Sequence, residues 1–158
     1  MKNTTLGYIE RDGCYLLLHR IKKENDLNKD KWIGIGGKLE ENESPEEGML
    51  REAKEETGLT VYAPRYCGIV TFVSDVWEGE YMHLFHITDF DGQLCECDEG
   101  VLEWIPKERF AKLPQWEGDK LFLRLMQENI PFFSLTMSFP SLRDREKIMF
   151  SAISPESR

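Results

Sequence analysis

Apolar and polar residues alternate along much of the chain, and this pattern predicts a protein built largely from β-strands. The segment 81–85 (Tyr-Met-His-Leu-Phe) shows the enrichment in aromatic and apolar residues that is typical of a strand. Near the N-terminus, Arg11-Asp12-Gly13 separates two such segments, which indicates a β-hairpin. The predicted strands are 4–10, 14–20, 32–38, 61–73, 80–88, 101–105 and 132–139, and 147–153 is expected to pair with the last of them.

Two segments instead have the pattern of helices. Ser44-Pro45-Glu46-Glu47 can begin a helix, because serine caps, proline suits the first turn and acids favour the helix dipole. Gly58 is well placed to end it. A second helix is predicted over 117–129, where Leu121, Leu125 and Met126 share one face. The fold class is therefore mixed α/β, with a mixed or antiparallel sheet flanked by two main helices.

The chain length of 158 residues fits one domain, and no repeat or linker divides it. We expect that domain to span residues 1–153 and the tail 154–158 to be frayed. No apolar run is long enough to cross a bilayer, and the first residues lack the apolar core of a signal peptide. The expected location is the cytoplasm, without membrane contact.

The formal net charge is −9, from 20 Lys+Arg and 29 Asp+Glu. This balance argues against a nucleic-acid groove, because duplex binding depends on clustered cations that neutralise phosphates. An acidic protein can still bind a small polyphosphate if a divalent metal lies between its carboxylates and the phosphates. The charge therefore favours metal-bridged binding.

The cysteines and histidines do not indicate a metal site. Cys95 and Cys97 have the wrong spacing for a zinc knuckle, and no second pair lies at ligand distance. We expect reduced thiols, as in the cytosol. His83 and His86 have opposite parity in a predicted strand and should point to opposite faces, in structural roles.

Three carboxylates lie on one face of the first predicted helix. Glu52, Glu55 and Glu56 occur at i, i+3 and i+4, a spacing at which like charges repel. A solvated helix face would interleave lysines there, yet Lys54 lies on a different face. Hard cations prefer oxygen ligands, so the cluster is a candidate magnesium or manganese site. The alternative is an ordinary solvated charge run.

The surrounding sequence resembles the Nudix box. Residues 37–59, GKLEENESPEEGMLREAKEETGL, match G-x5-E-x7-R-E-U-x-E-E-x-G-U without a gap, where U is a small or aliphatic apolar residue. The spacing also lets Glu43 and Arg51 meet across the junction of loop and helix, where an arginine–carboxylate pair would hold the loop. We expect Gly37, Glu43, Arg51 and Gly58 to be structural.

The resemblance implies an αβα sandwich around a mixed sheet and hydrolysis of a nucleoside diphosphate linked to a further group. By matching positions, the three helix carboxylates would bind Mg²⁺, with Mn²⁺ as a second option, and the Gly36 carbonyl would be a further ligand. Glu99 resembles the carboxylate that the family contributes from outside the box, with Asp98 and Glu96 as adjacent candidates. The catalytic residues are then Glu52, Glu55, Glu56 and Glu99, and the last three remain alternatives for the general base.

Beyond the box, the chain is similar to the MutT-type branch of the family, which removes oxidised nucleotides such as 8-oxo-dGTP. The resemblance implies products of nucleoside monophosphate and pyrophosphate, and substrate contacts from Lys38, Trp116 and Asp119. Trp116 would stack on the base and Asp119 would bind its edge; the alternatives are a core aromatic and a helix cap. Ile33 stands where relatives carry asparagine, so we expect looser base selection.

Other functions are open at this point. A different Nudix substrate, such as a dinucleoside polyphosphate, a nucleotide sugar or an RNA 5′ end, is one alternative. A nucleotide-binding domain without activity is another, although such domains usually lose box carboxylates and this chain keeps them all. The sequence carries no prediction of oligomeric state.

Overall fold

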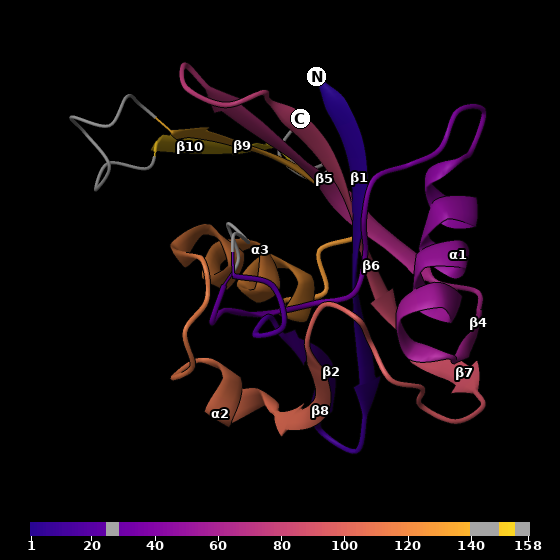
Figure 1. Cartoon of the computed structure of the whole chain (residues 1–158). Helices are drawn as coiled ribbons and strands as arrows, with labels where there is room; N and C mark the ends of the chain where they lie inside the picture. The colour runs from indigo at the N-terminus through magenta and orange to yellow at the C-terminus, as the bar shows by residue number, and fades with distance from the viewer. Residues whose placement is uncertain (25–28, 140–148, 154–158) are drawn as a thin grey trace.

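The computed structural model describes residues 1–24, 29–139 and 149–153, and shows a sheet between two helical layers (Figure 1). Helix α1 (Pro45–Thr57) lies on one side of the sheet, and α3 (Glu117–Gln127) lies on the other with the short α2 (Lys107–Phe110). The strands are β1 (Lys2–Arg11), β2 (Cys14–His19), β3 (Trp32–Ile33), β4 (Thr60–Tyr62), β5 (Arg65–Ser74), β6 (Glu80–Ile87), β7 (Asp89–Asp91), β8 (Val101–Pro106), β9 (Phe133–Phe139) and β10 (Met149–Ile153).

The main sheet is mixed, as predicted. Its order is β10-β9-β5-β6-β1-β2-β3, with β8 paired to β2. β1 runs parallel to β6 and β5 runs parallel to β9, whereas the other pairs are antiparallel. The antiparallel pairing of β10 with β9 confirms the pairing expected between the last two strands. Residues 147–148 and the tail 154–158 lie outside the described residues.

Two apolar clusters fill the two sides of the sheet, because successive strand residues point to opposite faces. Tyr8, Leu17 and Trp32 pack on the α3 side with Phe122 and Leu123 of α3. Ile9, Leu16 and Leu18 pack on the α1 side with Met49 and Ala53 of α1. The structure therefore confirms the αβα sandwich with its mixed sheet.

Some predicted strand boundaries are wrong. The strand expected over 61–73 is broken at Ala63, which adopts a left-handed backbone with φ 45°. β4 before the break pairs with β7 in a separate two-stranded sheet, and β5 continues in the main one. The strand expected over 32–38 is reduced to β3, after which Ile35 and Lys38 form isolated bridges to β1. Neither β7 nor α2 was predicted.

His83 and His86 contact polar side chains of β1. His83 Nε2 lies 3.1 Å from Asn3 Oδ1, and His86 Nε2 lies 2.9 Å from Glu10 Oε1. All four cysteines are free thiols. Within the described ranges, no helix has the length and apolar character needed to cross a membrane.

Candidate active site

Local interactions at both ends fix the position of helix α1. Ser44 and Glu47 form a capping box, in which the Ser44 hydroxyl accepts from Glu47 N at 3.1 Å and the Glu47 carboxylate accepts from Ser44 N. At the other end Gly58, with φ 82°, donates its N–H to the Lys54 carbonyl. The helix therefore begins and ends where the sequence predicted, and its carboxylates have a defined orientation.

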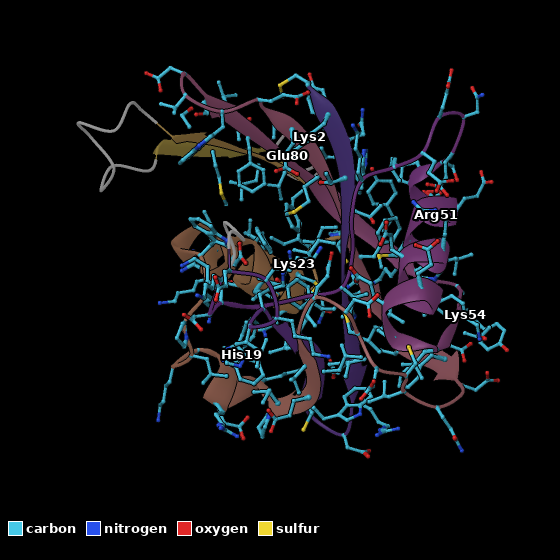
Figure 2. The ribbon with its side chains drawn as sticks, in the orientation of Figure 1. Lys2, His19, Lys23, Arg51, Lys54 and Glu80 are labelled. Atoms are coloured by element: carbon cyan, nitrogen blue, oxygen red, sulfur yellow. The ribbon has the colours of Figure 1, made fainter. Side chains whose placement is uncertain are left out.

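Arg51 joins this helix to the loop before it (Figure 2). Its guanidinium binds both oxygens of Glu43, at 2.7 and 2.9 Å, and donates to the Lys38 carbonyl at 3.1 Å. The same side chain donates to Glu52 at 3.0 Å and Glu55 at 3.2 Å. Hydrogen bonds from the Arg51 guanidinium and from the Glu40 N–H lower the pKa of Glu43 to about 2. The structure thus contains the arginine–carboxylate pair expected between Glu43 and Arg51, and the pair holds the loop against α1.

Gly36 and Gly37 bring the backbone close to the carboxylates. A Cβ on Gly36 would lie 1.9 Å from the Thr5 carbonyl oxygen, and one on Gly37 would lie 2.6 Å from Glu52 Oε1. No larger residue fits without a shift of backbone or carboxylate. The Gly36 N–H donates to Glu56 Oε2 at 3.0 Å. The glycine pair therefore lets the segment after β3 lie against the acidic face of α1.

Burial and like charge together perturb the carboxylates of that face. Burial raises the pKa of Glu56 to about 8, and the charges of Glu52 and Glu99 add to the rise. Burial also raises the pKa of Glu52, to which Glu55 and Glu99 contribute while Arg51 opposes. Glu55 is more exposed, with 59% of its side chain accessible. The electrostatic centre of the cluster is therefore formed by Glu52, Glu56 and Glu99.

Glu99 reaches this centre from the loop before β8. A bridge between Cys97 and Gly100 closes a tight turn, and a Cβ on Gly100 would lie 2.0 Å from the His19 carbonyl oxygen. Glu99 is bound by Arg20 at 2.9 Å and faces Lys23 at 3.7 Å. Because its charge acts on both Glu52 and Glu56, the structure brings Glu99 close to the acidic face of α1.

Trp116 and Asp119 lie at the start of helix α3. Trp116 is its half-buried N-cap residue, and Lys31 Nζ lies 4.5 Å from the centre of its ring. Asp119 is 7% exposed, and burial raises its pKa to about 7, while Lys31 lowers it. Within the described residues, α3 has no capping bond from its N-cap side chain. Asp119 is therefore a buried acid, three residues after the N-cap of α3.

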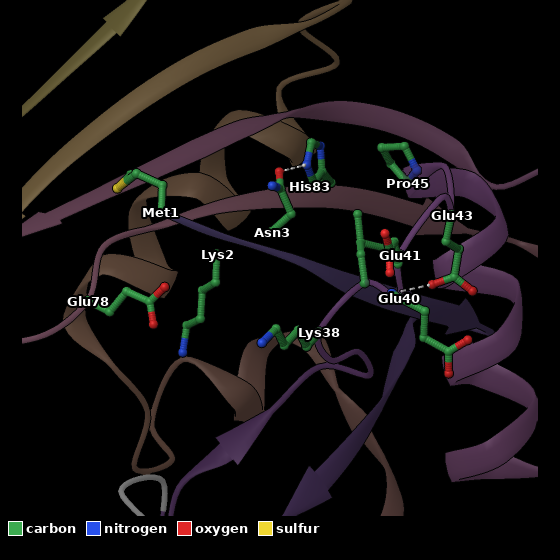
Figure 3. A pocket seen from close by; sticks show the side chains of 11 residues that line it. Met1, Lys2, Asn3, Lys38, Glu40, Glu41, Glu43, Pro45, Glu78 and His83 are labelled. Carbon is green, nitrogen blue, oxygen red and sulfur yellow. Dashed lines mark hydrogen bonds between the residues drawn. The ribbon is translucent and has the colours of Figure 1, made fainter.

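Ile33 and Lys38 contact other parts of the molecule than Trp116 and Asp119 do. Ile33 packs against the α1-side cluster, whereas Trp32 belongs to the α3-side cluster. Lys38 is exposed and lines a cavity of about 560 Å³ together with Lys2 and His83 (Figure 3). As far as the described residues go, the lining of this cavity includes neither the α1 carboxylates nor Trp116 and Asp119.

Comparison with known proteins agrees with this geometry. The family model described as NUDIX domain matches residues 4–126. The chain belongs to the Nudix hydrolase family.

Several known proteins are similar to this chain over most of its length. The oxidized purine nucleoside triphosphate hydrolase of Danio rerio is 31% identical over 133 residues, which cover 83% of each chain. The CTP pyrophosphohydrolase of Escherichia coli (strain K12) is 32% identical over 121 residues, or 75% of this chain and 86% of that protein. The crystal structure of a MutT protein from Bacillus halodurans has a TM-score of 0.81 at 25% identity, over 96% of this chain and 97% of that one. The predicted family and fold are confirmed.

The donor set of the Nudix box suits a hard divalent cation. Glu52, Glu56 and Glu99 offer carboxylate oxygens that repel one another, and a cation between them would relieve that repulsion. As the described side chains stand, no group of three or more acidic, histidine or cysteine residues is arranged to hold an ion. Arg51 binds Glu52, and Arg20 binds Glu99. The residues fit a cation chemically, because their carboxylates are the hard oxygen donors that Mg²⁺ and Mn²⁺ prefer.

Sequence reasoning missed three residues of this Nudix site. Arg20 holds Glu99, Lys31 contacts Trp116, and the buried Tyr8 hydroxyl experiences the charge of Asp119. Each contact joins segments far apart in the chain, so no local pattern marks them.

Proposed function

We propose that this Nudix hydrolase is a Mg²⁺-dependent nucleoside triphosphate pyrophosphohydrolase that acts on oxidised purine nucleotides such as 8-oxo-dGTP. The products would be a nucleoside monophosphate and pyrophosphate, and the site of action the cytoplasm, where free nucleotides occur. The observation that carries the proposal is the set of mutually repelling carboxylates, Glu52, Glu56 and Glu99, held against a glycine-rich backbone. The name of the Danio rerio relative supports the oxidised purine.

In the proposed reaction, Glu52, Glu55, Glu56 and Glu99 would hold the cation, and the Gly36 carbonyl would be a further ligand. A divalent cation there would neutralise charge that develops on the phosphates. The chain supplies the base that takes a proton from the attacking water, and Glu55, Glu56 and Glu99 are the candidates. Arg51 keeps the loop and helix in register, and Lys38 is proposed to contact the substrate.

Base selection is assigned to Trp116 and Asp119. Oxidation of guanine at C8 adds a carbonyl and converts N7 from an acceptor to an N–H donor. A carboxylate accepts from a purine N–H, and an indole ring stacks on the base. A buried acid left without its partner is costly, so such a contact discriminates better than shape alone. We therefore propose a higher kcat/KM for 8-oxo-dGTP than for dGTP.

A second candidate substrate is CTP. The Escherichia coli relative named for it is as similar to this chain as the purine hydrolase of Danio rerio. Both candidates use the same carboxylates and differ in the base that lies against Trp116. Other Nudix substrates, including dinucleoside polyphosphates, nucleotide sugars and RNA 5′ ends, belong in the same test.

The test is a turnover screen of the purified protein with Mg²⁺, Mn²⁺ or EDTA, with products separated by ion chromatography. The panel contains 8-oxo-dGTP, dGTP, dATP, CTP, a dinucleoside polyphosphate and a nucleotide sugar. We expect cation-dependent release of pyrophosphate, fastest from 8-oxo-dGTP. Direct release of phosphate would contradict the proposed cleavage to nucleoside monophosphate and pyrophosphate. If CTP is hydrolysed fastest, CTP takes the place of the oxidised purine as the proposed substrate. Binding of nucleotide without turnover would contradict hydrolysis.

A further inference from the structure

Residues 97–100 form a tight turn, the Glu99 turn, which is held at both of its ends. Just before the turn, Cys95 N donates to the carbonyl of Thr57, the last residue of α1, at 2.8 Å. At its far end, Gly100 lies so close to the end of β2 that a Cβ would be 2.0 Å from the His19 carbonyl oxygen. The Glu99 turn therefore leads from α1 to β2.

Lys22, three residues after the end of β2, binds the backbone of this turn twice. Its ammonium donates to the Cys97 carbonyl at 2.7 Å, and its N–H donates to the Glu99 carbonyl at 3.4 Å. An ammonium is a charged donor, and charge-assisted hydrogen bonds are shorter and stronger than neutral ones. The side chain of Lys22 therefore holds the first residue of the turn, and its backbone holds the third.

The segment that presents Lys22 is itself anchored. Arg20 N donates to the Lys31 carbonyl at 3.1 Å, and the Arg20 carbonyl accepts from Asp30 N at 2.7 Å. These bonds pair the chain just after β2 with the chain just before β3. Because Lys22 follows two residues later, its ammonium reaches the Glu99 turn from a backbone with a defined path.

Two other cationic side chains contact Glu99 in a different way. Arg20 donates to the Glu99 carboxylate at 2.9 Å, and Lys23 Nζ lies 3.7 Å from that carboxylate (Figure 2). Both interact with oxygens that a bound cation would use. Lys22 binds the Cys97 peptide instead, so it can hold the turn whether or not the carboxylate has a cation.

We propose that Lys22 is a positioning residue, whose bond to the Cys97 carbonyl holds the Glu99 turn so that the Glu99 carboxylate faces the acidic side of α1. The inference rests on the proposed function, since it takes Glu99 as a cation ligand. Groups that orient a metal ligand from behind commonly contribute about 10–100-fold to metal affinity. Lys22 acts through Glu99 and takes no part in the step that breaks the bond.

The experiment compares three variants of the nucleotide-free protein. Lys22→Met keeps the length of the side chain and loses its donor, whereas Lys22→Arg keeps a charged donor. Lys23→Met is the matched control, because it removes the same charge from the neighbouring residue, whose side chain faces the carboxylate. Mn²⁺ affinity is measured by electron paramagnetic resonance, and amide hydrogen exchange of residues 95–101 by mass spectrometry in EDTA. Urea unfolding establishes that each variant is folded.

We expect Lys22→Met to weaken Mn²⁺ binding by about tenfold and to speed amide exchange in the Glu99 turn, and Lys22→Arg to restore both. Charge alone would act in the opposite direction, because the loss of a positive charge near the site favours a bound cation. Lys23→Met should therefore bind Mn²⁺ at least as tightly as the wild type, with unchanged exchange. In a Glu99→Gln background, Lys22→Met should cause no further loss of affinity, since its effect passes through that carboxylate.

Three results would overturn the inference. Wild-type Mn²⁺ affinity in a folded Lys22→Met protein removes the positioning role, even if the wild type hydrolyses nucleotides as proposed. An equal loss of affinity in Lys22→Met and Lys23→Met removes the part played by the bond to Cys97. A full further loss in the Glu99→Gln background shows that Lys22 acts independently of Glu99.

Failure of the proposed function gives a different pattern. If the wild type binds no Mn²⁺ and hydrolyses no triphosphate, the proposed function fails and the role of Lys22 in cation binding fails with it. The exchange measurement in EDTA still decides whether Lys22 holds the Glu99 turn, because that measurement needs neither cation nor nucleotide.

Discussion

The buried carboxylate of Glu56 leads to a prediction in which stability and activity change in opposite directions. Replacing Glu56 by glutamine keeps the size of the side chain and leaves an oxygen for the Gly36 N–H. It removes an ionisable group that burial, Glu52 and Glu99 together disfavour in its charged form. Glu56→Gln should therefore stabilise the cation-free fold while it lowers kcat by at least about a hundredfold.

The size of the stabilisation follows from proton linkage. The pKa of Glu56 rises from 4.5 to about 8 on folding. At pH 7 the unfolded chain has lost this proton, whereas the folded protein mostly keeps it, so ionisation favours the unfolded state by roughly 3 kcal/mol. A group whose folded pKa is raised in this way lowers stability as the pH rises from the unfolded value to the folded one. The advantage of glutamine should therefore be absent below about pH 4 and grow towards pH 8.

The measurement is urea unfolding of wild type and Glu56→Gln in EDTA at several pH values between 4 and 8.5. Glu55→Gln is the matched control, because Glu55 is on the same helix and largely exposed, so its loss should change stability little. Added Mg²⁺ should stabilise the wild type more than Glu56→Gln, because the cation would bind a charged carboxylate.

Two outcomes would refute the reasoning. The first is a Glu56→Gln protein that is no more stable than the wild type at pH 7 without cations. The second is a gain that is the same at pH 4 and pH 7, since such a gain could not come from ionisation. Near-normal turnover of both Glu55→Gln and Glu56→Gln with saturating Mg²⁺ would contradict the site itself.

Three further predictions concern other parts of the site. Asp119→Ala should lower kcat/KM for purine triphosphates by about tenfold or more, because one hydrogen bond to a charged group is lost. Unchanged steady-state kinetics would contradict this prediction. Glu43→Gln should destabilise the fold at pH 7, and thermal denaturation should show this difference disappear as the pH falls from about 5 towards 2. The sign follows because the folded pKa of Glu43 is lowered to about 2, so its stabilisation is present above the unfolded value and is lost on protonation. Gly36→Ala should lower the free energy of unfolding by roughly 1–3 kcal/mol or more, because the new Cβ clashes with the Thr5 carbonyl. A variant as stable as the wild type with normal kcat would show that the close backbone contact is not required.

The parts of the site that depend on local chemistry were predictable from the sequence. Helix α1 runs from Pro45 to Thr57 as its capping residues indicated, because caps act within a few residues of the helix end. The spacing of Glu43 and Arg51 likewise predicted their contact. The fold class followed from the same local patterns together with the resemblance of the box.

Much of what sequence patterns missed depends on contacts between distant segments. The break at Ala63 lies between β4, which pairs with β7, and β5 of the main sheet. Pro64 and Arg65 directly after it were a local signal of the break that the prediction of one strand over 61–73 did not use. The surroundings of Asp119 depend on Lys31 and Tyr8, which come from other parts of the chain. Ile33 was compared with a base-reading asparagine, yet its contacts are to the α1-side cluster, a placement that requires the register of β3 against β2.

Under the proposed function, the sheet separates the residues that would hold the cation from those that would select the base. The box carboxylates belong to a helix on one face, Trp116 and Asp119 to a helix on the other, and the segment 31–37 touches both. Under that function, residues around α3 could change during evolution without disturbing the proposed cation ligands, provided that this short segment keeps its path. Such a division would allow one catalytic apparatus to be inherited intact while the preferred nucleobase diverges, and similar proteins are named for oxidised purines and for CTP.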